Sequence, residues 1–295
     1  MGFTSRKRMA YMIKAIGLAT MVRWYNIILV AICQYLSSLY ILNPNQPKLE
    51  TLLDYKLHLI VISTAFIIAA GYIINSFYDI EKDLVNRPNQ NVFGRLLSKN
   101  ISFNFYMTFN FLGVLIAFFT HDKYVFGFHL LLTLALWFYS HKLQKLPFVG
   151  EFSAALLTVS PFFSIVIYFN TFNYIIFFYV MFIFLISIAR EFIKSLEGLK
   201  GEIVYNYKTF PAVYGTIATK VVVSASLILT ALPVIFIYLR TGFEYMMIYF
   251  FLTSLIVAII LILINRTKTN YRLLNNLLKV VIALGILSIP LIKYG

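Results

Sequence analysis

The feature that most constrains this chain is a series of apolar stretches, each about 18 residues or longer, that recurs along its length. A stretch of this length can cross a bilayer as a helix. Only 12% of the residues are charged, whereas a soluble domain carries about a quarter. A soluble helical bundle would need polar outer faces on its helices, and these stretches mostly lack them. The sequence therefore predicts an all-α, polytopic integral membrane protein.

Short polar or turn-rich segments divide the apolar stretches into nine predicted spans. We place these spans at residues 19–41, 57–78, 103–120, 124–140, 152–169, 173–193, 217–239, 243–264 and 273–292. No linker, low-complexity segment or obvious internal repeat interrupts the series. We therefore expect residues 1–295 to form a single transmembrane domain, with the nine helices in one bundle.

The basic residues indicate how the chain is oriented. Most of the 25 lysine and arginine residues fall in the N-terminal segment and in four alternate loops, and Arg272 and Lys279 are assigned to the last of these. The positive-inside rule then places the N-terminus and those loops in the cytoplasm and the C-terminus outside, which requires an odd number of spans. The net charge of +14 is thus mainly topological and calls for no nucleic acid. We expect a multi-pass protein of the cell inner (plasma) membrane.

The acidic residues gather at two of the predicted cytoplasmic helix ends. In IINSFYDIEKDLVNRP, Asn75, Asp79 and Asp83 are four residues apart, which places them on one face of a helix. Stacked carboxylates repel, and the negative end of the helix dipole adds to this. A cluster of hard oxygen ligands suits Mg²⁺, and the spacing favours such a site. The alternative is a solvated helix end whose acids pair with Lys82 and Arg87.

These residues resemble a known family. The pattern N-x-x-x-D-x-x-x-D followed by N-R-P is similar to the first aspartate-rich motif of the UbiA superfamily of intramembrane prenyltransferases. Arg23 and Asn26 in VRWYNIILV resemble the family's Arg-Pro-x-Asn element, with tryptophan in place of proline. Tyr139 in FYSHKLQKLPFVGE begins a segment that resembles its Tyr-Ser-x-x-Leu-Lys element, with Gln144 at the lysine position and Lys145 beside it.

The segment REFIKSLEGLKGE, followed by TFPAVYG, resembles the second acidic motif of one branch, the geranylgeranylglycerol-phosphate geranylgeranyltransferases. The branch usually has aspartate where Ser195 and Gly198 stand, and Glu202 replaces its last aspartate. Three readings stay open: two glutamates still hold a second metal, or the first motif binds metal while lysines supply the missing charge, or the enzyme is weakened or repurposed. A Ser195→Asp change is expected to keep or raise activity.

The resemblance implies Mg²⁺-dependent transfer of a polyprenyl group, with geranylgeranyl diphosphate as the favoured donor and a glycerol-phosphate-type lipid as the favoured acceptor. It implies an active site that faces the cytoplasm and carries three sets of residues. The implied metal ligands are Asn75, Asp79, Asp83, Glu197 and Glu202; the diphosphate contacts are Arg23, Asn26, Arg87, Lys142, Lys145, Arg190 and Lys194; and Asp79, Asp83 and Tyr139 are the implied catalytic residues, with Glu191 retained in the second motif. Tyr139 would stabilise an allylic cation through its ring.

Other functions stay open at this point. An aromatic-acceptor prenyltransferase of quinone or pigment synthesis would share the scaffold and metal site. A non-enzymatic membrane homologue is the second alternative, because the second acidic motif is incomplete. A transporter would be expected to show inverted repeats or broken helix pairs, and the sequence has no obvious example of either. No obligate protein partner is evident.

Overall fold

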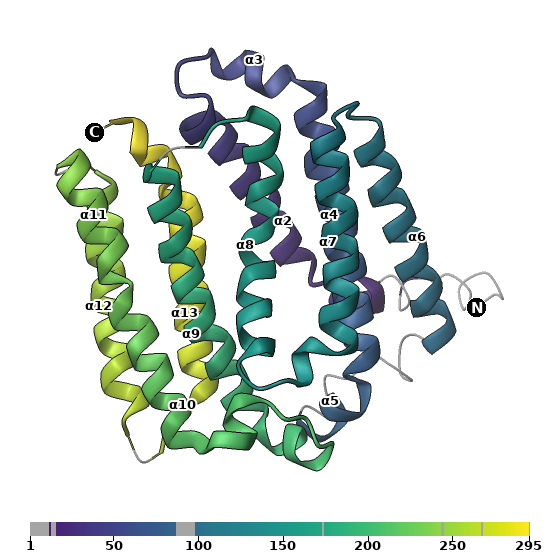
Figure 1. Ribbon diagram of the computed structural model, residues 1–295, viewed down its shortest axis with the longest axis vertical. Helices are drawn as coiled ribbons and strands as arrows, with labels where there is room; N and C mark the ends of the chain where they lie inside the picture. Colours follow the sequence, from purple (N-terminus) through teal and green to yellow (C-terminus); the bar gives the residue numbers. More distant parts are fainter. Residues whose placement is uncertain are drawn as a thin grey trace, which may run out of the picture.

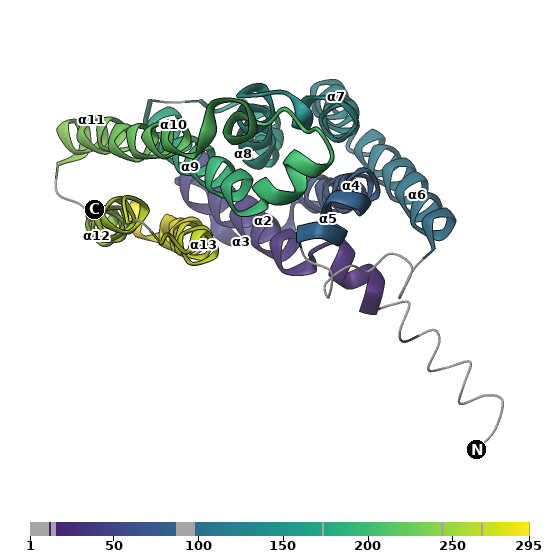
Figure 2. The ribbon, with the colours of Figure 1, turned by 90° about the horizontal axis from the view of Figure 1, so that it is seen from below.

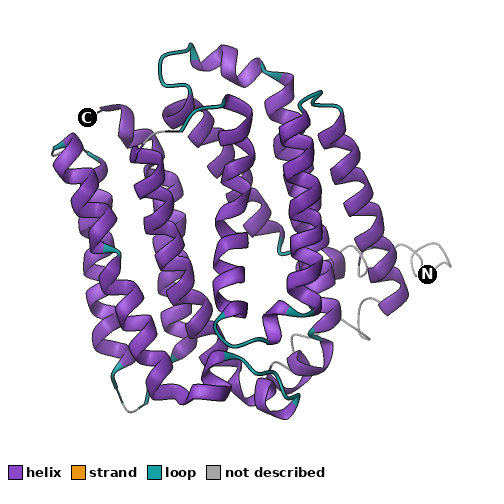
Figure 3. Ribbon diagram, viewed as in Figure 1, coloured by secondary structure: helices purple, strands orange, loops and turns teal. Residues whose placement is uncertain are grey.

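The computed structural model describes residues 12, 16–86, 98–172, 174–242, 245–266 and 268–294. Helices make up nearly all of these ranges, and no strand occurs in them (Figure 3). In chain order the elements are α2 (Trp24–Ser37), a π-helical turn (Ser38–Leu42), α3 (Lys48–Leu53), α4 (Tyr55–Tyr78), α5 (Ile80–Asn86), α6 (Lys99–Phe118), α7 (Lys123–His141), the 3₁₀ turn η3 (Leu143–Lys145), α8 (Val149–Phe169), α9 (Tyr174–Val204), α10 (Phe210–Leu229), α11 (Ala231–Thr241), α12 (Met246–Ile264), α13 (Tyr271–Ser288) and a final 3₁₀ segment (Ile289–Tyr294).

Within the described ranges, nine helices are long and apolar enough to cross a membrane, which confirms the nine predicted spans (Figure 1). The largest differences in extent from the prediction are in the sixth and seventh spans. The sixth, α9, continues to Val204 rather than ending at 193, and the seventh begins at Phe210 rather than 217. Both extensions are rich in polar and small residues, so a search for apolar stretches does not include them. The early part of α10 is bent at Gly215, whose φ of 82° is readily available only to glycine.

The hydrophobic core is centred on α9. Phe182, Ile186, Phe192 and Ile193 of this helix are almost completely buried, and α9 packs against α8, α10, α11 and α13. The close packing of α4 against α6 adds a smaller second cluster. Many large apolar side chains remain exposed on the outer surface, as expected for helices that face lipid rather than water.

One end of the bundle gathers the segments that carry the acidic motifs. In Figure 1 the short helix α5 and the first turns of α10 lie at the lower end, below the long helices. Figure 2, which views this end, shows α5 close to the ends of α4 and α9, and α5 packs on α9. The two acidic motifs, which are more than 100 residues apart in the sequence, therefore meet here.

Candidate active site

The first acidic motif lies where α4 passes into α5. Asp79 caps the end of α4, with a φ of −92° and a ψ of 4°, so the helix is interrupted at the middle residue of this series. The four-residue backbone hydrogen bonds nevertheless continue through the break, from Asp79 N to Asn75 O at 3.0 Å and from Asp83 N to Asp79 O at 2.8 Å. The three side chains therefore keep a common direction, and all three line one cavity.

Asp79 is buried, and three side chains hold its carboxylate. Asn75 Nδ2 donates to one oxygen at 2.7 Å, and Gln144 Nε2 donates to the other at 3.2 Å. Lys82 Nζ lies 3.0 Å from the second oxygen. Burial disfavours the charged ammonium of Lys82, but the nearby carboxylates of Asp79 and Glu202 outweigh this and raise its pKa. A cation is thus already held at the carboxylate where a metal would bind.

The second motif supplies cations from α9. Glu191 is buried between Arg190, 3.0 Å from one carboxylate oxygen, and Lys194, 2.9 Å from the other. Two cations around one carboxylate leave a net positive charge, and all three side chains line the cavity. The buried Nε of Arg190 has no hydrogen-bond partner among the described residues. This group of side chains is suited to bind an anion.

The two glutamates further along α9 also line the cavity, and each is held by partners of its own. Glu197 accepts a hydrogen bond from Asn275 Nδ2 at 3.1 Å and lies 3.5 Å from Arg272 Nε. Glu202 is buried and accepts a hydrogen bond from the Thr209 hydroxyl. No group of three or more histidine, cysteine, aspartate or glutamate side chains forms a metal cage in the part of the chain that the structure describes.

Asn86 joins the two motifs. Its Nδ2 donates to Gly198 O at 3.0 Å, and its Oδ1 accepts from Gly201 N at 2.9 Å. A Cβ atom at Gly201 would lie only 2.5 Å from Asn86 Nδ2 and 2.8 Å from Lys82 O. Glycine is therefore needed for α5 to approach α9 this closely.

The acidic residues of both motifs, together with Lys82, Asn86, Arg190 and Lys194, line one cavity of about 570 Å³ between the helices. Its polar end is formed by the two motifs and by residues at the start of α2. Its walls away from that end are mainly apolar and come from α2, α7, α8, α9 and α13, including Leu29, Leu132, Val159, Phe162, Ile183 and Ile286. The cavity therefore combines a charged end with an apolar interior.

Arg23, Asn26 and Tyr139 all line this cavity, as the sequence motifs led us to expect. Arg23 precedes α2 in a left-handed conformation, with a φ of 51°, and its guanidinium lies over the Tyr72 ring, 5.2 Å from the centroid. Asn26 Nδ2 donates to the Tyr72 hydroxyl at 3.0 Å. Tyr72 thus fixes both predicted diphosphate contacts against α4.

The other predicted phosphate contacts are placed differently. Lys142 is exposed and is not among the residues that line the cavity. Lys145 lies beside the site, with Nζ 5.0 Å from the Tyr207 ring centroid, and Lys82 Nζ is 4.9 Å from the same centroid. Arg87 falls outside the described residues. The structure thus brings Lys145 close to the site but leaves Lys142 away from it.

Ser195, one of the departures from the family pattern, turns away from the cavity. Its hydroxyl donates to Glu151 Oε1 at 3.2 Å, and the same oxygen accepts from Phe210 N at 3.1 Å. Glu151 is buried, and its Oε2 has no hydrogen-bond partner within the described chain. The serine therefore belongs to a junction of α8, α9 and α10 rather than to a metal site.

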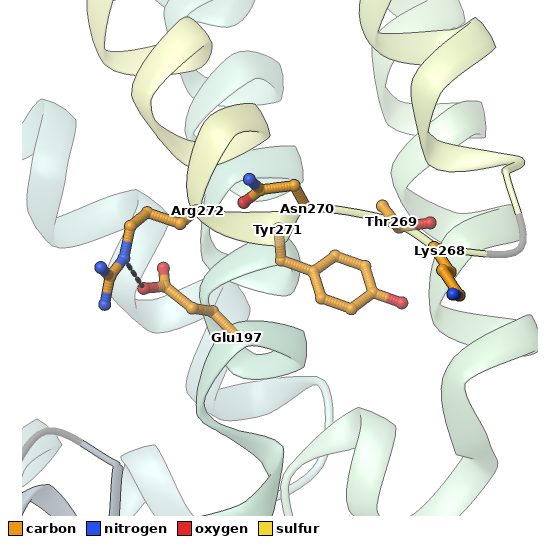
Figure 4. A pocket seen from close by; sticks show the side chains of 6 residues that line it. All are labelled: Glu197, Lys268, Thr269, Asn270, Tyr271 and Arg272. Carbon is orange, nitrogen blue, oxygen red and sulfur yellow. Dashed lines mark hydrogen bonds and ion pairs between the residues drawn. The ribbon is translucent and has the colours of Figure 1, made fainter.

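Sequence reasoning missed a group of polar residues on α13. A small hollow beside the main cavity is lined by residues 268–272 and by Glu197, which points toward Arg272 (Figure 4). Asn275 continues this face, and Lys279 lines the main cavity. The positive-inside rule alone had accounted for Arg272 and Lys279. The available signal was the position of Lys279 inside an apolar stretch.

The donor set of the first motif fits Mg²⁺. Asp79 and Asp83 carry carboxylate oxygens and Asn75 an amide oxygen, and all three residues line the cavity. Mg²⁺ prefers such ligands and is usually completed by water and substrate phosphates. The Lys82 ammonium at Asp79 shows that this carboxylate already attracts a cation. Asp79 of the first motif and Glu197 and Glu202 of the second are all engaged with other side chains, so each would exchange a protein partner for the metal.

An apolar bundle with acidic and basic groups at one end of an internal cavity is typical of a membrane protein that binds amphipathic anionic ligands. The model of the UbiA prenyltransferase family matches residues 31–276. This chain therefore belongs to the UbiA prenyltransferase family, a family of multi-pass membrane proteins.

Curated relatives carry one recurring name. Digeranylgeranylglyceryl phosphate synthase of Thermococcus sibiricus is 32% identical over 148 residues, which cover 49% of this chain and 51% of that protein. The enzyme of the same name from Sulfurisphaera tokodaii is 33% identical over 161 residues, 52% of this chain and 56% of that protein. The chain thus spans about half the length of these curated relatives in the matched regions.

Solved structures share the fold over nearly the whole chain. A UbiA homolog from Archaeoglobus fulgidus, bound to DMAPP and Mg²⁺, superposes with a TM-score of 0.70 at 16% identity and covers 92% of this chain and 98% of its own. At this identity the likeness establishes the fold alone. That protein binds a prenyl diphosphate and Mg²⁺ in the same architecture.

Proposed function

We propose that this chain is a Mg²⁺-dependent prenyltransferase that moves a polyprenyl group, most suitably geranylgeranyl, from its diphosphate to a glycerol-phosphate-type lipid. The observation that carries the proposal is the single cavity that joins the oxygen ligands of the first motif, the cations of the second and an apolar interior. The names of the curated relatives support the choice of acceptor. In this proposal, residues 1–295 form one catalytic domain.

The donor diphosphate would lie at the polar end of the cavity. Arg23, Arg190 and Lys194 would bind its oxygens, since guanidinium and ammonium groups form charge-assisted hydrogen bonds to phosphate. Asn75, Asp79 and Asp83 would hold Mg²⁺, which neutralises charge on the departing diphosphate. Lys82 and Lys145 lie at the edge of this end and add positive charge.

In the reaction, the bond between the first prenyl carbon and the diphosphate oxygen breaks, and its electron pair stays with the diphosphate. The acceptor hydroxyl oxygen bonds to that carbon, and its proton passes to the released diphosphate. Tyr139 lines the cavity where its ring can face the allylic cation and stabilise it. The apolar walls exclude water, which would otherwise capture the cation.

The polar end would face the cytoplasm. Lys82 and Lys194 line this end of the cavity and belong to the segments that carry most of the basic residues, which the positive-inside rule assigns to the cytoplasm. We propose an inner-membrane location, with the substrates taken from the cytoplasmic side.

The test uses purified protein in detergent with geranylgeranyl diphosphate, geranylgeranylglyceryl phosphate and Mg²⁺, with product followed by mass spectrometry. Asp79→Asn and Asp83→Asn should each lower turnover at least about 100-fold, because each removes a carboxylate ligand from the metal that stabilises the leaving group. Lys56→Met, at the opposite end of α4, serves as the unaffected control. Full turnover in either aspartate variant, or in EDTA, would refute the metal assignment. No product from any prenyl acceptor would refute the function.

A further inference from the structure

A lysine lies inside the membrane-spanning part of α13, and the chemistry above does not use it. Lys279 is eight residues after Tyr271, the first residue of α13, which places it about 12 Å along the helix axis. The helix and its final turn form one of the nine apolar spans. A charged side chain at this depth is costly, and such residues usually mark a functional site.

Lys279 belongs to a continuous polar face of α13. Arg272, Asn275 and Lys279 are three and four residues apart, so they follow one side of the helix. Further along the same helix, Ala283 and Ile286 line the cavity, as Lys279 does. This face therefore changes from a surface cation to a cation within the cavity and then to an apolar wall.

Glu197 of α9 orients the first part of this face. It accepts from Asn275 Nδ2 at 3.1 Å and lies 3.5 Å from Arg272 Nε, toward which it points in Figure 4. Asn275 is 5% exposed, and its Oδ1 has no hydrogen-bond partner within the described chain. Glu197 thus fixes Asn275 and Arg272 on the side of α13 that leads to Lys279.

The cavity reaches the outer surface of the bundle at this level. Tyr25 of α2 and Lys279 and Val280 of α13 all line the cavity, and all three are also exposed. The helices α2 and α13 are neighbours. An amphipathic lipid that enters from the bilayer between them would bring its head group to Lys279 and keep its chain among apolar side chains.

We infer that Lys279, with Arg272 further along the same helix face, binds the phosphate of a phosphorylated lipid acceptor. This inference rests on the proposed function and identifies the part of the cavity that selects its second substrate. The donor diphosphate uses a different set of cations, on α2 and on the Arg190 turn of α9. Two anionic substrates repel each other in a cavity of low dielectric, so separate cationic groups are needed to bind both at once.

The experiment measures the binding of geranylgeranylglyceryl phosphate to the full chain in detergent, without a prenyl donor, and the KM values for acceptor and donor. Lys279→Met should weaken acceptor binding and raise the acceptor KM by about tenfold or more, the effect of losing a hydrogen bond to a charged group. The donor KM should stay within about twofold. Lys279→Arg should largely restore binding, and Lys123→Met, at the far end of α7, is the matched control.

The phosphate-free lipid geranylgeranylglycerol separates a phosphate subsite from a structural effect. Its binding should be equal in the wild type and in Lys279→Met. Equal binding of the phosphorylated lipid to both proteins would overturn the inference, as would a parallel loss for both lipids. If the wild type transfers no prenyl group but Lys279 still determines binding of the phosphorylated lipid, the proposed function fails and the subsite stands.

Discussion

Restoring the aspartate that the family pattern expects at position 195 should damage this protein. The serine hydroxyl donates to Glu151 Oε1 at 3.2 Å, and Glu151 is buried with its other oxygen unpartnered. Ser195→Asp would replace that donor with a second carboxylate at about the same distance.

The magnitude follows from this distance. Two unit charges 3.2 Å apart repel by about 5 kcal/mol at an effective dielectric constant of 20. Side-chain movement and uptake of a proton by the pair relieve part of this. We therefore expect Ser195→Asp to lower the free energy of unfolding by about 2–4 kcal/mol, in the range of other buried charges without partners.

Thermal unfolding in detergent, followed by circular dichroism, measures this effect. Ser195→Asn is the matched control, because its amide has the same size, carries no charge and can donate to Glu151. It should unfold within a few degrees of the wild type. The double variant Ser195→Asp/Glu151→Gln should recover most of the lost stability, since it removes one of the two charges. A single Ser195→Asp variant as stable as Ser195→Asn would refute the reasoning, and a gain in activity would restore the earlier expectation drawn from the sequence.

Two further perturbations test other parts of the structure. Gly201→Ala should cost about 1–3 kcal/mol and reduce prenyl transfer, because the new methyl group displaces Asn86 and separates the two motifs. Gly127→Ala, within α7 where no atom lies within 4 Å of the added Cβ, should lower neither quantity. Gln34→Leu should lower the free energy of unfolding by about 1–3 kcal/mol, because the buried Gln34 amide donates to three acceptors on α4 and α8. Unchanged thermal unfolding would show that these hydrogen bonds do not stabilise the bundle.

Much of the architecture could be predicted because its cause is local in the sequence. Apolar stretches long enough to cross a bilayer gave the nine spans, and the spacing of Asn75, Asp79 and Asp83 gave their common direction. The break at Asp79 could not be predicted in this way. There the side chain of Asp79 accepts a hydrogen bond from Gln144, which is 65 residues away in the sequence and comes close only in the folded bundle.

The candidate site was less predictable where a residue's partner comes from a distant helix. The sequence shows Ser195 as a missing aspartate, but the structure shows it as a donor to Glu151. It shows Lys279 as one of many basic residues near a loop, but the structure places it on the cavity wall. Charge and motif position specify which residues are unusual, whereas the direction of each side chain is decided by tertiary packing.

The length of α9 links the site to the physical state of the bilayer. Its 31 residues extend about 46 Å, whereas the hydrocarbon core of a typical bilayer is about 30 Å thick. One uninterrupted helix therefore spans the membrane and carries the later part of the second motif, Glu197 and Glu202, beyond the hydrocarbon core. A helix that is longer than the membrane adapts to thickness by tilting, and any tilt of α9 moves Arg190 and Glu197 relative to α4. Asn86 opposes that displacement at the far end. We therefore expect the turnover rate to change with the acyl-chain length of the bilayer, because bilayer thickness sets the tilt of α9.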